Sequence, residues 1–199
     1  MQEKTIKSVL RRKFDDWMAS IDNEGLKKLI QRDAICTGGA IASMLMAEKV
    51  NDYDFYFKTE ETTFQTALYY VNKFKENPPS RFKGNQDRLM DLRIVVIAGR
   101  VKIVVQSQGI AGEKGTDDYE YFESVDDPSE PQEFVDNVVK DKEEADKTGK
   151  PKYRPVFLTS NAVSLSDQIQ LITRFYGAVE EIHENYDFIH CTCSWDAET

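Results

Sequence analysis

Residues 38–57 read GGAIASMLMAEKVNDYDFYF and contain three successive structural signals. The Gly-Gly pair at the start is typical of a turn, and residues 34–39 as a whole are predicted to form a short loop. Residues 40–47 are good helix formers with apolar bulk, which predicts a buried helix. Residues 51–57 alternate polar and aromatic side chains, which favours a strand. The stretch therefore predicts the order turn, helix, strand.

Two features of this stretch suit the binding of a triphosphate. Gly38 and Gly39 have no side chains, so their backbone can approach phosphate oxygens, and the following helix offers free N–H groups at its N-terminus. Asp52 and Asp54 are spaced i and i+2 on the predicted strand, so both carboxylates are expected to project from one face. Because Mg²⁺ prefers carboxylate and phosphate oxygens as ligands, the pattern predicts a magnesium-dependent site for a nucleoside triphosphate.

This arrangement resembles the nucleotidyltransferase superfamily of the DNA polymerase β type, in which a glycine pair, a helix and an acidic-hydrophobic-acidic strand follow one another. The sequence of residues 38–57 looks most like the head domains of poly(A) polymerases and CCA-adding tRNA nucleotidyltransferases, and like nucleotidyltransferase proteins of bacteriophages. The phage-type resemblance extends through residues 157–177 to residues 185–191. One departure is that the CCA-adding pattern has Arg-Asp after the glycines where this chain has Ala42-Ser43, so the resemblance does not imply specificity for tRNA ends.

The resemblance implies a set of site residues and their roles. It makes Asp52 and Asp54 catalytic metal ligands, and it places Gly38, Gly39 and Ser43 against the triphosphate. It also implies a third catalytic, metal-binding carboxylate on a neighbouring strand. Asp187 in the sequence Tyr-Asp-Phe has the matching local setting, and Asp91, before a predicted hairpin, is a second and weaker candidate.

The function implied is transfer of a nucleoside monophosphate from a triphosphate to a hydroxyl group, with release of pyrophosphate. The cofactor is Mg²⁺ or Mn²⁺, and the acceptor class stays open between RNA, a nucleotide and a protein. Two alternatives remain beside this enzyme. One is a noncatalytic binding protein of the same fold, and the other is the catalytic fragment of a larger enzyme.

The rest of the chain alternates helical and strand-like segments. Helices are predicted over residues 4–20, 22–30, 62–77 and 164–175, from apolar side chains at helical spacing and from caps at Asp22 or Asn23, Thr62 or Thr63, and Ser164. Strands are predicted over residues 92–98 and 101–106 as a hairpin, over residues 155–160, and over residues 186–191. Gly177 is expected to end the last helix. The class predicted is α/β or α+β, a mixed sheet flanked by helices in a single nucleotidyltransferase head domain over residues 1–199.

Charge and hydropathy set the expected surroundings of the protein. The net charge is −9, which argues against a basic surface that binds nucleic acid nonspecifically. Residues 113–150 contain fourteen Asp or Glu and five Lys, so this stretch carries the whole net charge and is predicted to be an acidic surface insertion. No run of apolar residues is long enough for a membrane span, so we expect a cytoplasmic protein without membrane contact, in the host cytoplasm if a phage encodes it.

Overall fold

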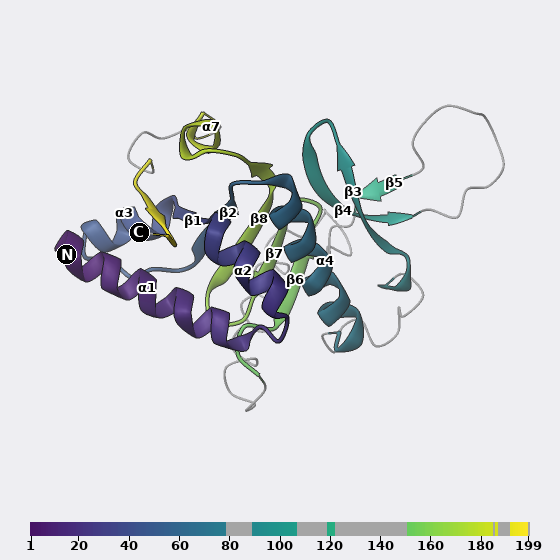
Figure 1. The fold of residues 1–199 in the computed structure, drawn as a ribbon, viewed down its shortest axis with the longest axis horizontal. Helices are drawn as coiled ribbons and strands as arrows, with labels where there is room; N and C mark the ends of the chain where they lie inside the picture. The colour runs from purple at the N-terminus through teal and green to yellow at the C-terminus, as the bar shows by residue number, and fades with distance from the viewer. Residues whose placement is uncertain (79–88, 107–118, 122–150, 185, 187–191, 199) are drawn as a thin grey trace, which may run out of the picture.

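The structure is a computed structural model that describes residues 1–78, 89–106, 119–121, 151–184, 186 and 192–198 (Figure 1). Its helices are α1 (Glu3–Ser20), α2 (Glu24–Asp33), α3 (Gly39–Leu45), α4 (Glu60–Glu76) and α7 (Val179–His183). Its strands are β1 (Ala34–Thr37), β2 (Tyr53–Phe57), β3 (Leu92–Ile97), β4 (Arg100–Gln106), β5 (Tyr119–Tyr121), β6 (Pro155–Thr159), β7 (Ala162–Leu165), β8 (Ile169–Tyr176) and β9 (Ser194–Asp196).

The strands form one large mixed sheet and one small sheet. The large sheet has six strands in the order β6-β7-β8-β2-β1-β9. Its two central strands, β2 and β8, run parallel, and its other neighbouring pairs run antiparallel. The small sheet has the order β3-β4-β5 and meets the large one where the Ile103 amide donates to the Ser160 carbonyl at 3.1 Å. The predicted α+β class with a mixed sheet flanked by helices is therefore confirmed.

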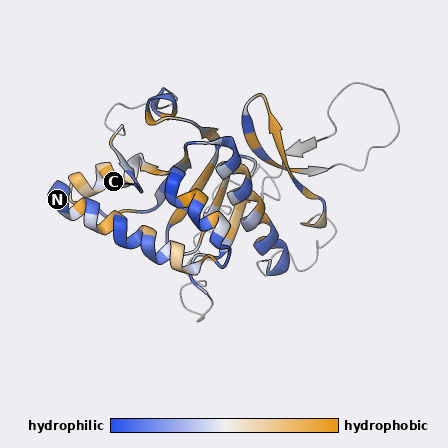
Figure 2. Cartoon of the chain, viewed as in Figure 1, coloured by the Kyte–Doolittle hydropathy of each residue, from blue (hydrophilic) through white to orange (hydrophobic). Residues whose placement is uncertain are grey.

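Two hydrophobic clusters cover the two faces of the large sheet. Helices α1 to α4 pack on one face, where Phe14 and Trp17 of α1 contact Phe55 of β2. Figure 2 shows helices with hydrophilic and hydrophobic stripes beside largely hydrophobic central strands, as amphipathic packing requires. On the opposite face, Ile182 of α7 packs with Ile35 and Tyr56. Successive residues of β1 and β2 thus point to opposite cores, as the two-residue period of a strand dictates.

Several predictions of local structure are confirmed. The helices expected at residues 4–20 and 22–30 are α1 and α2, and Asn23 caps α2 by accepting a hydrogen bond from the Leu26 amide at 3.0 Å. The helix after the glycines is α3, the strand before residue 58 is β2, and the hairpin is formed by β3 and β4. The third helix, α4, begins earlier than predicted because its cap is Thr59, which accepts from the Thr62 amide.

Two predictions of local structure are wrong. Residues 34–37 form the buried strand β1 rather than a loop, because every side chain from Ala34 to Thr37 is buried in the sheet. The helix expected at residues 164–175 is instead the hairpin of β7 and β8, with Gly177 in the turn that leads to α7 rather than at a helix end. The reason is a two-residue alternation within each strand that helical spacing obscured: bulky buried apolar residues lie two positions apart in β7, at Val163 and Leu165, and in β8, at Ile169 and Leu171.

Two further predictions concern segments that the structure covers only in part. Of the acidic insertion at residues 113–150, only β5 lies within the described residues. Of the strand expected at residues 186–191, only Tyr186 is described, and it is not in a strand. Within the described ranges, no helix has both the length and the apolar character needed to cross a bilayer.

Candidate functional site

The glycine pair and the Asp-x-Asp segment meet at one end of the β1–β2 pair. The two strands run antiparallel with Cys36 opposite Phe55, so the end of β1 lies beside the start of β2. Gly38 follows β1 directly, and Asp54 is the second residue of β2. Asp52 lies two residues earlier, just before the strand begins. The fold therefore brings together the two parts of the motif that are separated by α3 in the sequence.

Gly38 has a conformation that only glycine adopts readily. Its φ of 97° lies in the left-handed region, where a Cβ would cause strain. A Cβ at Gly38 would lie 3.5 Å from Oδ2 of Asp54 and 3.5 Å from the hydroxyl of Tyr186. A Cβ at Gly39 would meet no atom within 4 Å. The turn thus places bare backbone beside a carboxylate, with open space at the second glycine.

The charge of Asp54 acts on buried groups around it. Burial raises the pKa of the Cys36 thiol, and the nearby Asp54 carboxylate adds to this effect. Burial also raises the pKa of Tyr186; the hydroxyls of Tyr56 and Thr37 oppose this, and the charge of Asp54 raises the pKa further. Both Asp52 and Asp54 are half-buried. The Asp54 carboxylate and the Tyr186 hydroxyl thus lie close to the same glycine, and the raised pKa keeps that hydroxyl protonated and able to donate a hydrogen bond.

A polar cluster from α7 and the chain after it adjoins the glycine turn. Thr37, the last residue of β1, donates to the Cys193 carbonyl at 3.0 Å and lies 2.8 Å from Nε2 of His183. The tautomer of the His183 ring sets which of the two groups donates in this second contact. The ring of Tyr186 packs on His183 at 5.2 Å and on Tyr56 at 6.1 Å between centroids. Helix α7 is thereby fixed against the end of β1.

On its other side, Asp54 has polar neighbours along the sheet. Gln170 of β8 stands opposite Asp54 in the parallel register, and Ser164 of β7 stands opposite Gln170. Side chains of paired residues lie on the same face of a sheet, so these three form a polar row. The strand neighbour of Asp54 in β8 is thus an amide. The third carboxylate that the sequence interpretation expected, at Asp187, lies outside the described residues.

The remaining predicted site residues have separate positions. Ser43 is half-buried in α3, one turn after Gly39. Asp187 lies outside the described residues, and its described neighbour Tyr186 lies beside Gly38. Asp91 directly precedes β3 of the small sheet, away from β2. Among the described residues, no group of three or more His, Cys, Asp or Glu side chains is close enough to hold a metal ion.

Comparison with known proteins assigns the family. A family model described as "Gabija anti-defense 2 family protein" matches residues 8–199. The chain belongs to this family. No curated protein and no solved structure gives a match.

This finding corrects the resemblance to the nucleotidyltransferase superfamily. The family model that matches almost the whole chain is described as an anti-defense family, and its description names no polymerase, CCA-adding enzyme or other nucleotidyltransferase. The resemblance rested mainly on two short motifs, Gly38-Gly39 and Asp52-Tyr53-Asp54. Turns and strands of many folds contain such pairs, so the motifs could not identify the family even though the fold brings them together.

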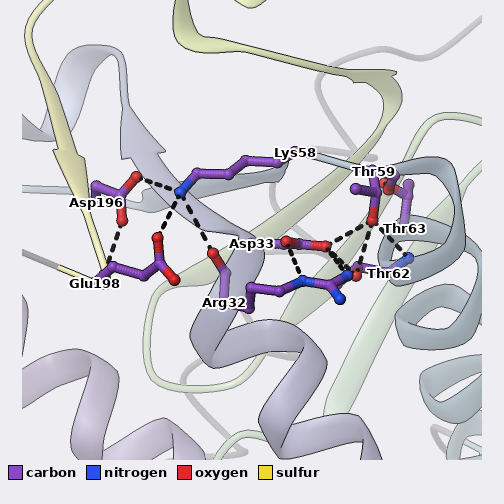
Figure 3. Close-up of polar contacts among 8 residues, drawn as sticks. All are labelled: Arg32, Asp33, Lys58, Thr59, Thr62, Thr63, Asp196 and Glu198. Atoms are coloured by element: carbon purple, nitrogen blue, oxygen red, sulfur yellow. Dashed lines mark hydrogen bonds and ion pairs between the residues drawn. The ribbon is translucent and has the colours of Figure 1, made fainter.

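The sequence interpretation missed a second polar network at the opposite end of β1 and β2 (Figure 3). Asp33, at the end of α2, is only 2% exposed. It accepts two hydrogen bonds from Arg32, at 2.7 and 2.8 Å, and further ones from the hydroxyls of Thr59 and Thr62. Burial raises the pKa of Asp33, but these hydrogen bonds outweigh it and lower the pKa to about 2. Lys58 extends the network to β9 through an ion pair with Asp196 at 2.6 Å.

The residues missed at the Gly38 end share one property. His183, Tyr186 and Gln170 reach the site from parts of the chain more than 100 positions after the glycines. No spacing rule links them to Gly38, because the sheet order alone makes them neighbours. Asp33 gave a weak signal, since a charged residue next to a buried strand requires partners.

Proposed function

We propose that the chain acts against the Gabija defence that its family description names, and that it does so by metal-dependent nucleotidyl transfer at the site around Gly38 and Asp54. The observation that supports this chemistry is the glycine turn. It holds bare backbone next to the Asp54 carboxylate and leaves open space at Gly39, an arrangement that suits a polyphosphate bound beside a metal ligand.

The donor set fits a hard divalent cation. Carboxylates are preferred ligands of Mg²⁺ and Mn²⁺, which complete their coordination with water and with substrate phosphates. In this proposal Asp52 and Asp54 hold the metal. A bound cation of this kind neutralises phosphate charge and lowers the pKa of an attacking hydroxyl. Gly38 and Gly39 approach the phosphates of a nucleoside triphosphate, Ser43 contacts them from α3, and Asp187 orients the acceptor hydroxyl.

The proposal extends to the fold and to the setting of the reaction. The sequence β1, glycine turn, α3 and β2 serves as the turn, helix and acidic strand of a nucleotidyltransferase fold. The acceptor is a hydroxyl of an RNA, a nucleotide or a protein, and pyrophosphate is released. The protein works in the host cytoplasm, where a component of the defence is the most direct acceptor.

The test measures transfer of labelled nucleoside monophosphate. Purified protein is incubated with each α-labelled triphosphate, Mg²⁺ or Mn²⁺, and RNA and protein from cells that carry the defence. We expect label on one acceptor class, and we expect Asp54→Asn to reduce transfer to background because the amide cannot replace a metal-binding carboxylate. The matched control is Asp22→Asn, which removes the exposed ion pair with Lys73 and should leave transfer unchanged. Full transfer by Asp54→Asn would contradict the proposed metal site.

A second candidate function is noncatalytic binding of a nucleotide at the same site. The amide of Gln170 beside Asp54 favours it, because an amide binds ligand oxygens without activating a hydroxyl group. In that case the protein would still act against the defence although no labelled nucleotide is transferred to any acceptor. Nucleotide binding by the wild-type protein without turnover, at every metal and acceptor tested, would support this candidate over the enzyme.

A further inference from the structure

Tyr186 presents its hydroxyl to the same point as Asp54. The hydroxyl oxygen and Oδ2 of Asp54 each lie 3.5 Å from the position that a Cβ on Gly38 would occupy. The hydroxyl is shielded from solvent. The hydroxyls of Tyr56 and Thr37 lie close enough to influence it, yet it forms no hydrogen bond of good geometry within the described residues. A buried polar group in this state destabilises the free protein and calls for an explanation.

The phenol ring is held in position from two sides. It packs on Tyr56 of β2 and on His183 of α7, with centroid distances of 6.1 and 5.2 Å. His183 is in turn fixed by its 2.8 Å contact with Thr37, the residue before Gly38. The position of the hydroxyl is therefore set by the same strand end that sets the glycine turn, so it can meet a ligand without rearrangement.

We propose that the Tyr186 hydroxyl is a ligand-binding group of this site and donates a hydrogen bond to an anionic phosphate oxygen bound at Gly38. The inference rests on the proposed function, in which that site holds a triphosphate. Asp54 can only accept hydrogen bonds, so it contacts phosphate through a metal, whereas the phenol contacts phosphate oxygen directly. The ligand would give the buried Tyr186 hydroxyl the hydrogen-bond partner that it lacks among the described residues.

The test is the substitution Tyr186→Phe, which keeps the ring contacts and removes only the hydroxyl. The probe is inorganic triphosphate with Mg²⁺, measured by calorimetry, together with the thermal unfolding of the free protein. We expect the affinity for triphosphate to fall roughly ten- to hundred-fold, the usual effect of losing a hydrogen bond to a charged group. We also expect the melting temperature of the free variant to equal or exceed that of the wild type.

The matched control is Tyr176→Phe, which removes a surface hydroxyl bonded to Glu60 at 2.6 Å and should not change triphosphate affinity. Unchanged affinity in Tyr186→Phe, with a lower melting temperature, would overturn the inference and assign the hydroxyl a structural role. If the wild-type protein binds neither triphosphate nor any nucleoside triphosphate, the proposed function itself fails, and the inference fails with it. The two failures are distinguished by whether the wild type binds.

Discussion

The two ends of the β1–β2 pair hold an aspartate in opposite surroundings. At one end Asp33 is buried, and hydrogen bonds from Arg32, Thr59 and Thr62 occupy its carboxylate (Figure 3). At the other end Asp54 is half-buried next to bare backbone at Gly38. The acceptor capacity of Asp33 is used within the fold, so it can contribute stability but not binding. Space beside a carboxylate, more than the carboxylate itself, distinguishes a candidate site from a structural network.

The largest effect on stability is expected for Asp33→Ala. The substitution leaves the hydroxyls of Thr59 and Thr62 without their acceptor in a buried place and removes both hydrogen bonds from Arg32. Loss of such a buried, charge-assisted network costs about 3 kcal/mol of the free energy of unfolding. Urea denaturation followed by tryptophan fluorescence measures this loss. Asp22→Ala, at an exposed ion pair, is the control and should change stability by less than about 1 kcal/mol.

The pH dependence of stability provides a second readout for Asp33. Its pKa is about 2 in the folded protein and 3.8 in the unfolded chain, so its contribution is fully present above pH 3.8 and is lost as the pH falls towards 2. The contribution amounts to roughly 2 kcal/mol. Asp33→Asn should flatten the stability profile between about pH 5 and pH 2. An unchanged acid slope in this variant would show that the carboxylate is not held in its charged form.

The sequence predicted the elements that local rules control. Helices α1 and α2, the cap at Asn23 and the hairpin of β3 and β4 follow from spacing and capping within a few residues. Strand β1 was missed because four buried residues have no measurable period. The hairpin of β7 and β8 was mistaken for a helix because its capping-like Ser164 and its Asp167-Gln168 turn, with φ values of 62° and 64°, masked a two-residue alternation.

The candidate site was predictable only in part. Gly38, Asp52 and Asp54 are close in sequence, and the short strand-helix-strand connection brings them together. Tyr186, His183 and Gln170 join them through the parallel pairing of β2 with β8 and the return of α7 over the sheet. Such long-range pairing depends on the total packing of the sheet, which no local motif specifies.

Substitutions at the glycine pair are expected to have an intermediate effect on stability. They compare a glycine whose positive φ disfavours a side chain, Gly38, with one that has open space around it, Gly39. Gly38→Ala imposes a φ of 97° on a residue with a Cβ, which costs about 1–2 kcal/mol of stability. Gly39→Ala begins helix α3 and meets no atom within 4 Å, so the fold should be unaffected or slightly more stable. If phosphate occupies that space, Gly39→Ala weakens triphosphate binding without loss of stability. Equal binding by Gly39→Ala and wild type would show that the ligand does not reach the second glycine.

The smallest effect is expected for Lys58→Met, which tests whether the network at the Asp33 end is one unit or two. Lys58 pairs with Asp196 of β9 at 2.6 Å, with both side chains partly exposed, and its Nζ also reaches the Arg32 carbonyl at 3.3 Å. Methionine keeps the apolar stem, so the substitution should cost only about 0.5–1 kcal/mol.

The salt dependence separates Lys58 from Asp33 more sharply than the size of the effect. An ion pair in contact with water weakens as salt screens it, so the cost of Lys58→Met should shrink in about 1 M salt. The cost of Asp33→Ala should persist, because its hydrogen bonds are buried and short-ranged. Urea denaturation of both variants at low and high salt makes the comparison. Suppose that Lys58→Met lowers the free energy of unfolding as much as Asp33→Ala does, and that salt changes neither effect. The ion pair with β9 and the buried carboxylate then act as a single network, and the edge strand β9 contributes to the stability of the whole fold.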